Sequence, residues 1–145
     1  GDAWVYGDAQ VYGNAQVCGN AQVCGDAQVC GNAQVCGDAW VYGDAWVYGD
    51  AWVYGDAWVC GNARVYGNAQ VYKTTHILTV GEIGSRDDFT TFYRNKDNGI
   101  SVKCGCFNGT IDDFASKVEK THGDNKHAKV YKLAIELAKA QMDCE

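Results

Sequence analysis

A six-residue repeat occupies the first half of the chain and constrains its fold more than any other feature. Residues 1–72 are twelve consecutive hexapeptides without an insertion, each reading Gly, Asp or Asn, Ala, a variable residue, Val, and Tyr or Cys. The last three residues of a unit predict a short β-strand, with Val on one face and its neighbours on the other. Gly followed by Asp or Asn predicts a turn that tolerates positive φ. A short strand and a turn repeated at constant length must coil.

The spacing of small apolar residues in the repeat points to one architecture. Val is followed four residues later by Ala, as in Val5 and Ala9, and this continues to Val71. The pattern resembles the hexapeptide-repeat family, whose members form left-handed parallel β-helices of triangular section. The resemblance implies three hexapeptides per coil, hence four coils, with Val and Ala inside. We expect the second half of the chain to cap one end, and upstream residues or a partner chain to cover the end at Gly1.

Stacking of residues eighteen positions apart predicts an outward aromatic belt around the third coil. One Trp lies on each face, and a Tyr accompanies each: Trp40, Trp46, Trp52, Tyr42, Tyr48 and Tyr54. Outward rings on every face exceed what a soluble monomer usually exposes, and members of the family are often homotrimers. We therefore expect a self-association interface. A stacking platform for sugars or bases is the alternative, with Arg64 as the single basic residue of the repeat.

Cysteine replaces tyrosine at one repeat position in five units. Cys18 and Cys36 are expected to be neighbours at a separation that permits a disulfide. We favour free thiols that act as small apolar side chains, because no signal segment opens the chain, which also favours a cytoplasmic location. Along one corner, Asp8, Asp26 and Asp44 are expected to stack as solvated turns, with a calcium ladder as the less favoured alternative.

The resemblance also implies an enzymatic relationship, because hexapeptide acyltransferases belong to the family. Their catalysis typically rests on a His that acts as general base. Residues 1–72 contain no His and no inserted loop. We therefore predict no catalytic residue and no cofactor, and keep an acyltransferase-like enzyme as a disfavoured alternative.

Composition changes at Lys73, and residues 73–145 predict a small α+β module of order βββαα. The expected strands are His76–Ile83, Phe89–Arg94 and Ile100–Phe107. A turn signal at 96–99 joins the last two strands. Thr110 is expected to cap a helix that Gly123 ends, and Asp124 or Asn125 to begin a second helix. The expected apolar stripe of that second helix is Val130, Leu133, Ile135, Leu137 and Ala138.

This second half resembles a small module of unassigned activity found in Firmicutes and their prophages. The resemblance covers roughly residues 76–140 and rests on segments such as Val102-Lys103-Cys104-Gly105-Cys106-Phe107 and Thr121-His122-Gly123-Asp124-Asn125. It implies little about chemistry. It favours a protein borne by a phage or a mobile element.

Candidate sites in the second half are few. Gly84-Ser85-Arg86 can hold an anion through backbone N–H groups and a guanidinium, although a plain turn is favoured. Arg94, Lys96 and Lys103 are expected near the hairpin as a basic patch. The weak metal candidates are Cys104, Cys106, His122 and His127. Their spacing suits a zinc site poorly, so we predict no metal.

Charge and hydropathy exclude some classes of function. Residues 1–72 carry seven Asp and one Arg, and residues 73–145 carry eleven basic and eleven acidic residues. Neither half is a basic binder of duplex nucleic acid, and no apolar run is long enough to span a membrane. We expect a non-enzymatic, oligomeric binding or scaffold protein whose C-terminal modules capture a host protein. The alternative is a sponge for a nucleotide signal of host defence.

Overall fold

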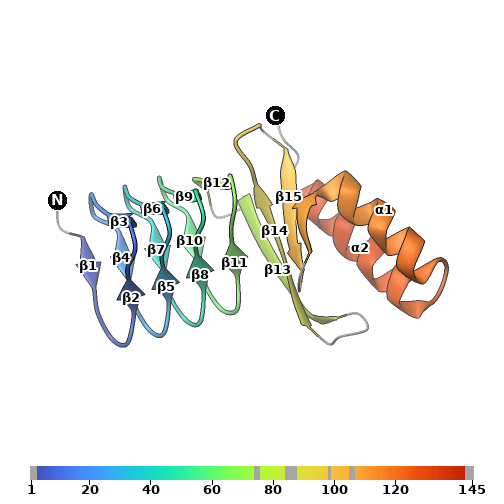
Figure 1. Ribbon diagram of the computed structural model, residues 1–145, viewed down its shortest axis with the longest axis horizontal. Helices are drawn as coiled ribbons and strands as arrows, with labels where there is room; N and C mark the ends of the chain where they lie inside the picture. The colour runs from blue at the N-terminus through green and yellow to red at the C-terminus, as the bar shows by residue number, and fades with distance from the viewer. Residues whose placement is uncertain (1–2, 74–75, 84–87, 98, 105–106, 143–145) are drawn as a thin grey trace.

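In the computed structural model, the hexapeptide repeat winds into four coils of a parallel β-solenoid, as expected (Figure 1). The structure describes residues 3–73, 76–83, 88–97, 99–104 and 107–142. Each hexapeptide contributes one two-residue strand. The strands are β1 (Trp4–Val5), β2 (Gln10–Val11), β3 (Gln16–Val17), β4 (Gln22–Val23), β5 (Gln28–Val29), β6 (Gln34–Val35), β7 (Trp40–Val41), β8 (Trp46–Val47), β9 (Trp52–Val53), β10 (Trp58–Val59), β11 (Arg64–Val65) and β12 (Gln70–Val71).

Three parallel sheets form the faces of the solenoid. We call them face A (β1-β4-β7-β10), face B (β2-β5-β8-β11) and face C (β3-β6-β9-β12). Every pairing joins residues eighteen positions apart, as in Trp4↔Gln22 and Val5↔Val23. The expected register is therefore confirmed.

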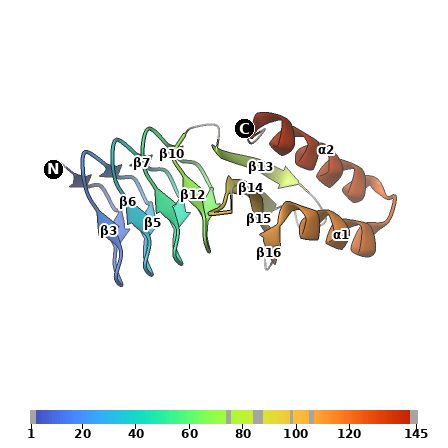
Figure 2. The ribbon, with the colours of Figure 1, turned by 90° about the horizontal axis from the view of Figure 1, so that it is seen from above.

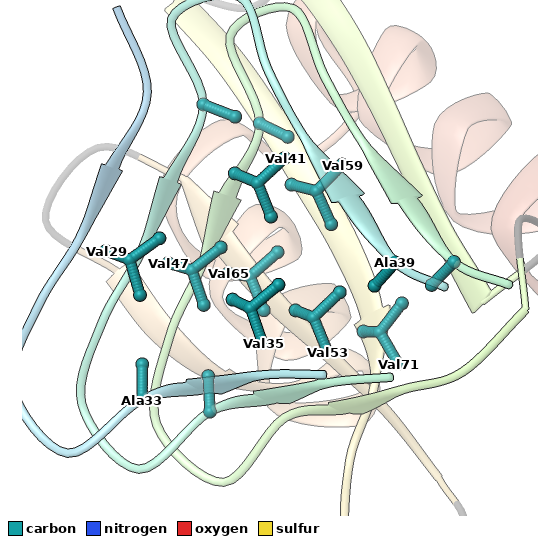
Figure 3. Close-up of a cluster of buried hydrophobic side chains, with 14 of the residues drawn as sticks. Val29, Ala33, Val35, Ala39, Val41, Val47, Val53, Val59, Val65 and Val71 are labelled. Atoms are coloured by element: carbon teal, nitrogen blue, oxygen red, sulfur yellow. The ribbon is translucent and has the colours of Figure 1, made fainter. Parts of the chain in front are cut away.

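Valine and alanine fill the interior of the solenoid in columns that run along its axis (Figure 3). From Ala21 to Val71 these side chains are at most 1% exposed. In the first coil the same positions are less covered, and Val5 is 47% exposed. Each hexapeptide contributes only one Val and one Ala to the core. Each coil therefore depends on the neighbouring coils to bury these side chains.

The corners require glycine because successive coils approach through their backbones. Gly37 has a φ of +68°, and a Cβ placed on it would lie 2.9 Å from the backbone N of Gly55. Side-chain amides also link one corner along the axis: Asn14 Nδ2 donates to Asn32 Oδ1, and Asn32 Nδ2 donates to Asp50 Oδ1, both over 3.2 Å. Gly and Asn or Asp at the corners therefore serve both the turn within a coil and the contact between successive coils.

A four-stranded antiparallel sheet follows the solenoid, where three strands were expected. Its strands are β13 (Ile77–Ile83), β14 (Asp88–Arg94), β15 (Ile100–Cys104) and β16 (Phe107–Thr110), paired in chain order. The expected strand Ile100–Phe107 is wrong as a single element, because Cys104 pairs with Phe107 and the chain reverses between them.

This sheet covers the last coil of the solenoid, as expected, and satisfies part of its open edge. The Thr91 hydroxyl accepts a hydrogen bond from the Arg64 N–H over 3.0 Å, and the Lys96 N–H donates to the Asn68 carbonyl over 3.0 Å. The Tyr93 ring is 1% exposed and packs into the solenoid core, while Asn108 Nδ2 donates to its hydroxyl over 2.8 Å. Burial raises the pKa of Tyr93 to about 12.

Two helices cover the opposite face of the sheet (Figure 2). They are α1 (Ile111–His122) and α2 (Lys126–Gln141). The expected caps are confirmed: the Thr110 hydroxyl accepts from the Asp113 N–H, Gly123 ends α1, and Asn125 Oδ1 accepts from the Ala128 N–H.

The expected apolar stripe of α2 is partly wrong. Its buried residues are Ala128, Tyr131, Ala134, Ile135 and Ala138. Leu133 is 70% exposed, Leu137 is 51% exposed and Val130 is only half-buried. The helix carries apolar residues on two faces, and the sequence does not say which of them meets the sheet.

Candidate functional site

The aromatic belt lies on the outside of the solenoid, one indole per face. Trp40 is in β7 on face A, Trp46 is in β8 on face B, and Trp52 is in β9 on face C. Each indole precedes a fully buried valine, so strand alternation turns it outward. Trp46 is 36% exposed and Trp52 is 44% exposed.

Each indole of the belt is held against a tyrosine of its own repeat. The Trp40–Tyr42, Trp46–Tyr48 and Trp52–Tyr54 centroids are 6.2, 6.2 and 6.3 Å apart, with the rings close to perpendicular. Edge-to-face contacts of this kind favour a fixed ring orientation. The belt therefore presents ordered apolar surface whose side chains have little entropy to lose on binding.

Face A extends the belt into the next coil. Trp58 lies above Trp40 with ring centroids 5.4 Å apart and planes 13° from parallel, and it is 48% exposed. Tyr42 meets the Trp58 ring edge-on at 6.2 Å. Face A thus offers a continuous patch of three rings.

Face B combines aromatic rings with the one guanidinium of the repeat. Arg64 lies 4.4 Å from the centroid of the Trp46 ring, and Tyr48 lies 4.4 Å from Tyr66. Burial raises the pKa of Tyr48, and the nearby charge of Arg64 opposes that shift. Arg64 Nη1 is buried and is the one such side-chain atom without a hydrogen-bond partner among the described residues.

Face C ends in a polar junction with the sheet, which sequence reasoning missed. Tyr54 and Tyr72 stack at 5.2 Å, and Arg94 lies 5.0 Å from the Tyr72 ring centroid. The Tyr72 N–H donates to His76 Nδ1 over 3.3 Å, and Arg94 Nη1 lies 3.3 Å from His76 Nε2. His76 is buried at this junction. The alternation from His76 to Ile83 predicted a strand there, but nothing in the sequence paired His76 with Tyr72.

The sheet ladder separates Lys103 from Arg94. In the sheet, Lys103 stands opposite Thr91, three residue pairs along the ladder from Arg94 and Ile100. Arg86 lies outside the described residues, with the whole Gly84-Ser85-Arg86 segment.

The weak metal candidates are not gathered into a site in the part of the chain that the structure describes. There, no group of three His, Cys, Asp or Glu side chains is placed to hold an ion. His122 and His127 face each other at 5.5 Å between ring centroids, and the Thr90 hydroxyl donates to Cys104 Sγ over 3.2 Å. Cys106 lies outside the described residues.

The cysteines of the repeat occupy the same outward position as tyrosine, the last residue of each hexapeptide. Cys18 and Cys36 are free thiols in neighbouring coils of face C, where burial and then the Cys18 side chain raise the pKa of Cys36. Cys18 directly follows β3 and Cys36 directly follows β6, and these two strands pair in register. The expected adjacency of the two cysteines is therefore confirmed.

The comparisons with known proteins bear on the repeat. The YdcK β-solenoid repeat matches residues 3–25, 15–31, 27–43, 33–49 and 57–73. No curated protein and no solved structure matches the chain significantly. No helix in the described residues is long and apolar enough to cross a membrane. The N-terminal half of the chain is therefore a repeat-built parallel β-solenoid, and five segments of it are similar to the YdcK β-solenoid repeat.

Proposed function

We propose that this protein is a non-enzymatic scaffold that self-associates through its aromatic belt and displays its C-terminal modules to capture a partner. The observation that carries the proposal is the presence of ordered, exposed indoles on all three faces of a rigid solenoid. Trp46, Trp52 and Trp58 are between 36% and 48% exposed. Aromatic residues are enriched in the cores of protein interfaces, where they bury large areas at low entropic cost.

A homotrimer with parallel solenoid axes is the arrangement we propose. Each subunit has an outward indole on every face, so one face of a subunit can meet another face of the next around a closed ring. The sheet and helices lie at one end of the solenoid (Figure 1), so a parallel trimer carries three modules at the same end. Three copies bind a partner with greater avidity than one.

A host protein is the class of partner we propose, and a phage or a mobile element the origin. This step rests on the resemblance of residues 76–140 to the prophage-associated module.

The second candidate function is a sponge for a nucleotide signal. Two observations favour it: Arg64 lies over the Trp46 ring at 4.4 Å, and Arg94 over the Tyr72 ring at 5.0 Å. An arginine beside an aromatic ring suits a phosphate joined to a base. Thermal-shift measurements with cyclic and linear nucleotides test it, and acyl-CoA in the same series tests the acyltransferase alternative.

The mass of the protein in solution tests the scaffold proposal. Gln occupies the Trp position in six repeats, so Trp40, Trp46, Trp52 and Trp58 can be replaced by Gln without leaving the repeat pattern. Light scattering with reductant present should give a trimer for the natural sequence and a monomer for the variant. The matched control replaces Gln22, Gln28 and Gln34 by Ala and should remain trimeric. A monomeric natural protein, or a variant that stays trimeric, would contradict the proposal.

A further inference from the structure

The outer face of α2 carries an apolar seam that stays largely exposed in the part of the chain that the structure describes. Val130, Leu133, Leu137 and Ala140 follow one another at spacings of three, four and three residues. The helix packs on the sheet and on α1 through a different set, which includes Tyr131, Ile135 and Ala138. Leu133 and Leu137 are 70% and 51% exposed, next to each other on successive turns. A spacing of three and four residues is that of helix-to-helix packing.

Lysines flank this seam and give it a charge. Lys126, Lys129, Lys132 and Lys139 are exposed on α2, against the single carboxylate of Glu136. One helix thus carries four of the twelve basic residues of a chain whose net charge is −6. The solenoid, in contrast, holds seven Asp and one Arg. Positive charge is concentrated beside the exposed leucines.

We infer that the outer face of α2, with Leu133 and Leu137 at its centre, docks an acidic amphipathic helix of a protein partner. The inference rests on the proposed function, because it names the class of partner that the displayed modules capture. Leucines three and four residues apart fill the groove of a facing helix. Glutamates or aspartates beside that helix's apolar residues pair with the lysines of α2.

Charge and composition favour an acidic helix over two other occupants of this surface, a second copy of α2 and a membrane. A second copy of α2 would bring four lysines against four lysines, and like charges across an interface disfavour that pairing. An interfacial membrane helix carries Trp, Phe or Leu on its apolar face, which enters the headgroup region. The seam of α2 has no aromatic residue, and the rest of the helix is fixed against the sheet.

Three synthetic peptides of three heptads each test the inference. The acidic probe has Leu at positions a and d and Glu at e and g. The basic probe replaces Glu by Lys, and the polar probe keeps Glu but replaces Leu by Ser. Fluorescence anisotropy with the full chain should show binding of the acidic probe alone. Binding of the basic probe or of the polar probe with equal strength would overturn the inference, as would no binding of the acidic probe.

Variants of α2 tie the binding to the seam. Leu133→Gln with Leu137→Gln should weaken the acidic probe by at least about tenfold, since two leucines lose apolar contact. Lys129→Glu with Lys132→Glu should weaken the acidic probe and strengthen the basic one. Lys96→Gln, at the hairpin on the solenoid side of the sheet, is the charge control and should bind like the natural sequence. Unchanged binding in both α2 variants would overturn the inference.

Two further measurements separate the outcomes. The first is binding of the protein to vesicles of phosphatidylglycerol and phosphatidylcholine. If the protein binds these vesicles through Leu133 and Leu137 but does not bind the acidic probe, the surface is a membrane site instead. The Trp→Gln variant of the belt should still bind the acidic probe as a monomer. If the natural protein is monomeric but binds the probe, the trimer proposal fails and the docking surface stands.

Discussion

Replacing Gly37 by Ala tests whether the solenoid depends on close approach between the corners of successive coils. Gly37 has a φ of +68°, and an added Cβ would lie 2.9 Å from the backbone N and 3.3 Å from the backbone O of Gly55. Gly61 occupies the same turn position with a φ of +62°, yet an added Cβ there meets nothing within 4 Å. Gly61→Ala therefore isolates the cost of positive φ, and the difference between the two variants measures the clash.

The magnitudes follow from these two geometries. A side chain in the left-handed region costs about 1–2 kcal/mol, and both variants bear that cost. Forcing packed backbone apart adds about 1–3 kcal/mol in Gly37→Ala only. We therefore expect losses of unfolding free energy of about 1–2 kcal/mol for Gly61→Ala and about 2–5 kcal/mol for Gly37→Ala. In a chain of this size each kcal/mol lowers Tm by about 2–4 °C.

Urea unfolding followed by far-UV circular dichroism measures both losses. Protein concentration must be the same in both experiments, because self-association adds to apparent stability. Equal losses in the two variants would refute the reasoning, since they would show that the coils have room for a methyl group at the corner.

Three other predictions concern the solenoid core, the sheet that covers the last coil, and the N-terminal cap of α2. Val41→Ala should lower the free energy of unfolding by about 2 kcal/mol because the Val41 side chain is fully buried. Val5 is 47% exposed, so Val5→Ala should lower it by less than about 0.5 kcal/mol. Urea midpoints that fall equally in the two variants would contradict this prediction. Burial raises the pKa of Tyr93 to about 12, so the unfolded chain, with its Tyr pKa near 10, releases that proton first. Stability should therefore be complete below about pH 10 and fall by about 2–3 kcal/mol towards pH 12, and Tyr93→Phe should remove this part of the pH dependence in unfolding measured across that range. Asn125→Ala should cost about 1 kcal/mol by removing the acceptor for the Ala128 N–H, measured as a lower Tm, and an unchanged Tm would mean that the cap does not stabilise α2.

Much of the solenoid could be read from the sequence because its contacts are local and repeated. A period of six fixes which residue of each unit is a turn, which points inward and which points outward. Once one coil is defined, the register of all later coils follows, as Trp58↔Trp40 and Arg64↔Trp46 illustrate. The belt residues Trp40, Trp46 and Trp52 could be placed on three faces for the same reason.

The second half was less predictable because its pattern does not repeat. The caps at Thr110, Gly123 and Asn125 were readable, since a helix end depends on residues within one turn. The reversal between Cys104 and Phe107 was missed because the apolar pattern of one long strand and of two paired strands is the same. Leu133 was assigned to the core because α2 has apolar residues on both sides, and periodicity alone does not choose between them.

The sequence by itself determined the coiling of residues 1–72, the Val and Ala interior and the outward aromatic rings, because those features follow from the alternation of a strand and from a constant repeat length. Only the tertiary structure decided that Tyr93 enters the solenoid core, that His76 and Arg94 meet Tyr72, and that Leu133 and Leu137 remain on the surface. These contacts join segments that are distant in the chain or depend on which face of α2 reaches the sheet. Such choices are settled by the shapes of two packed surfaces, and no local pattern carries that information.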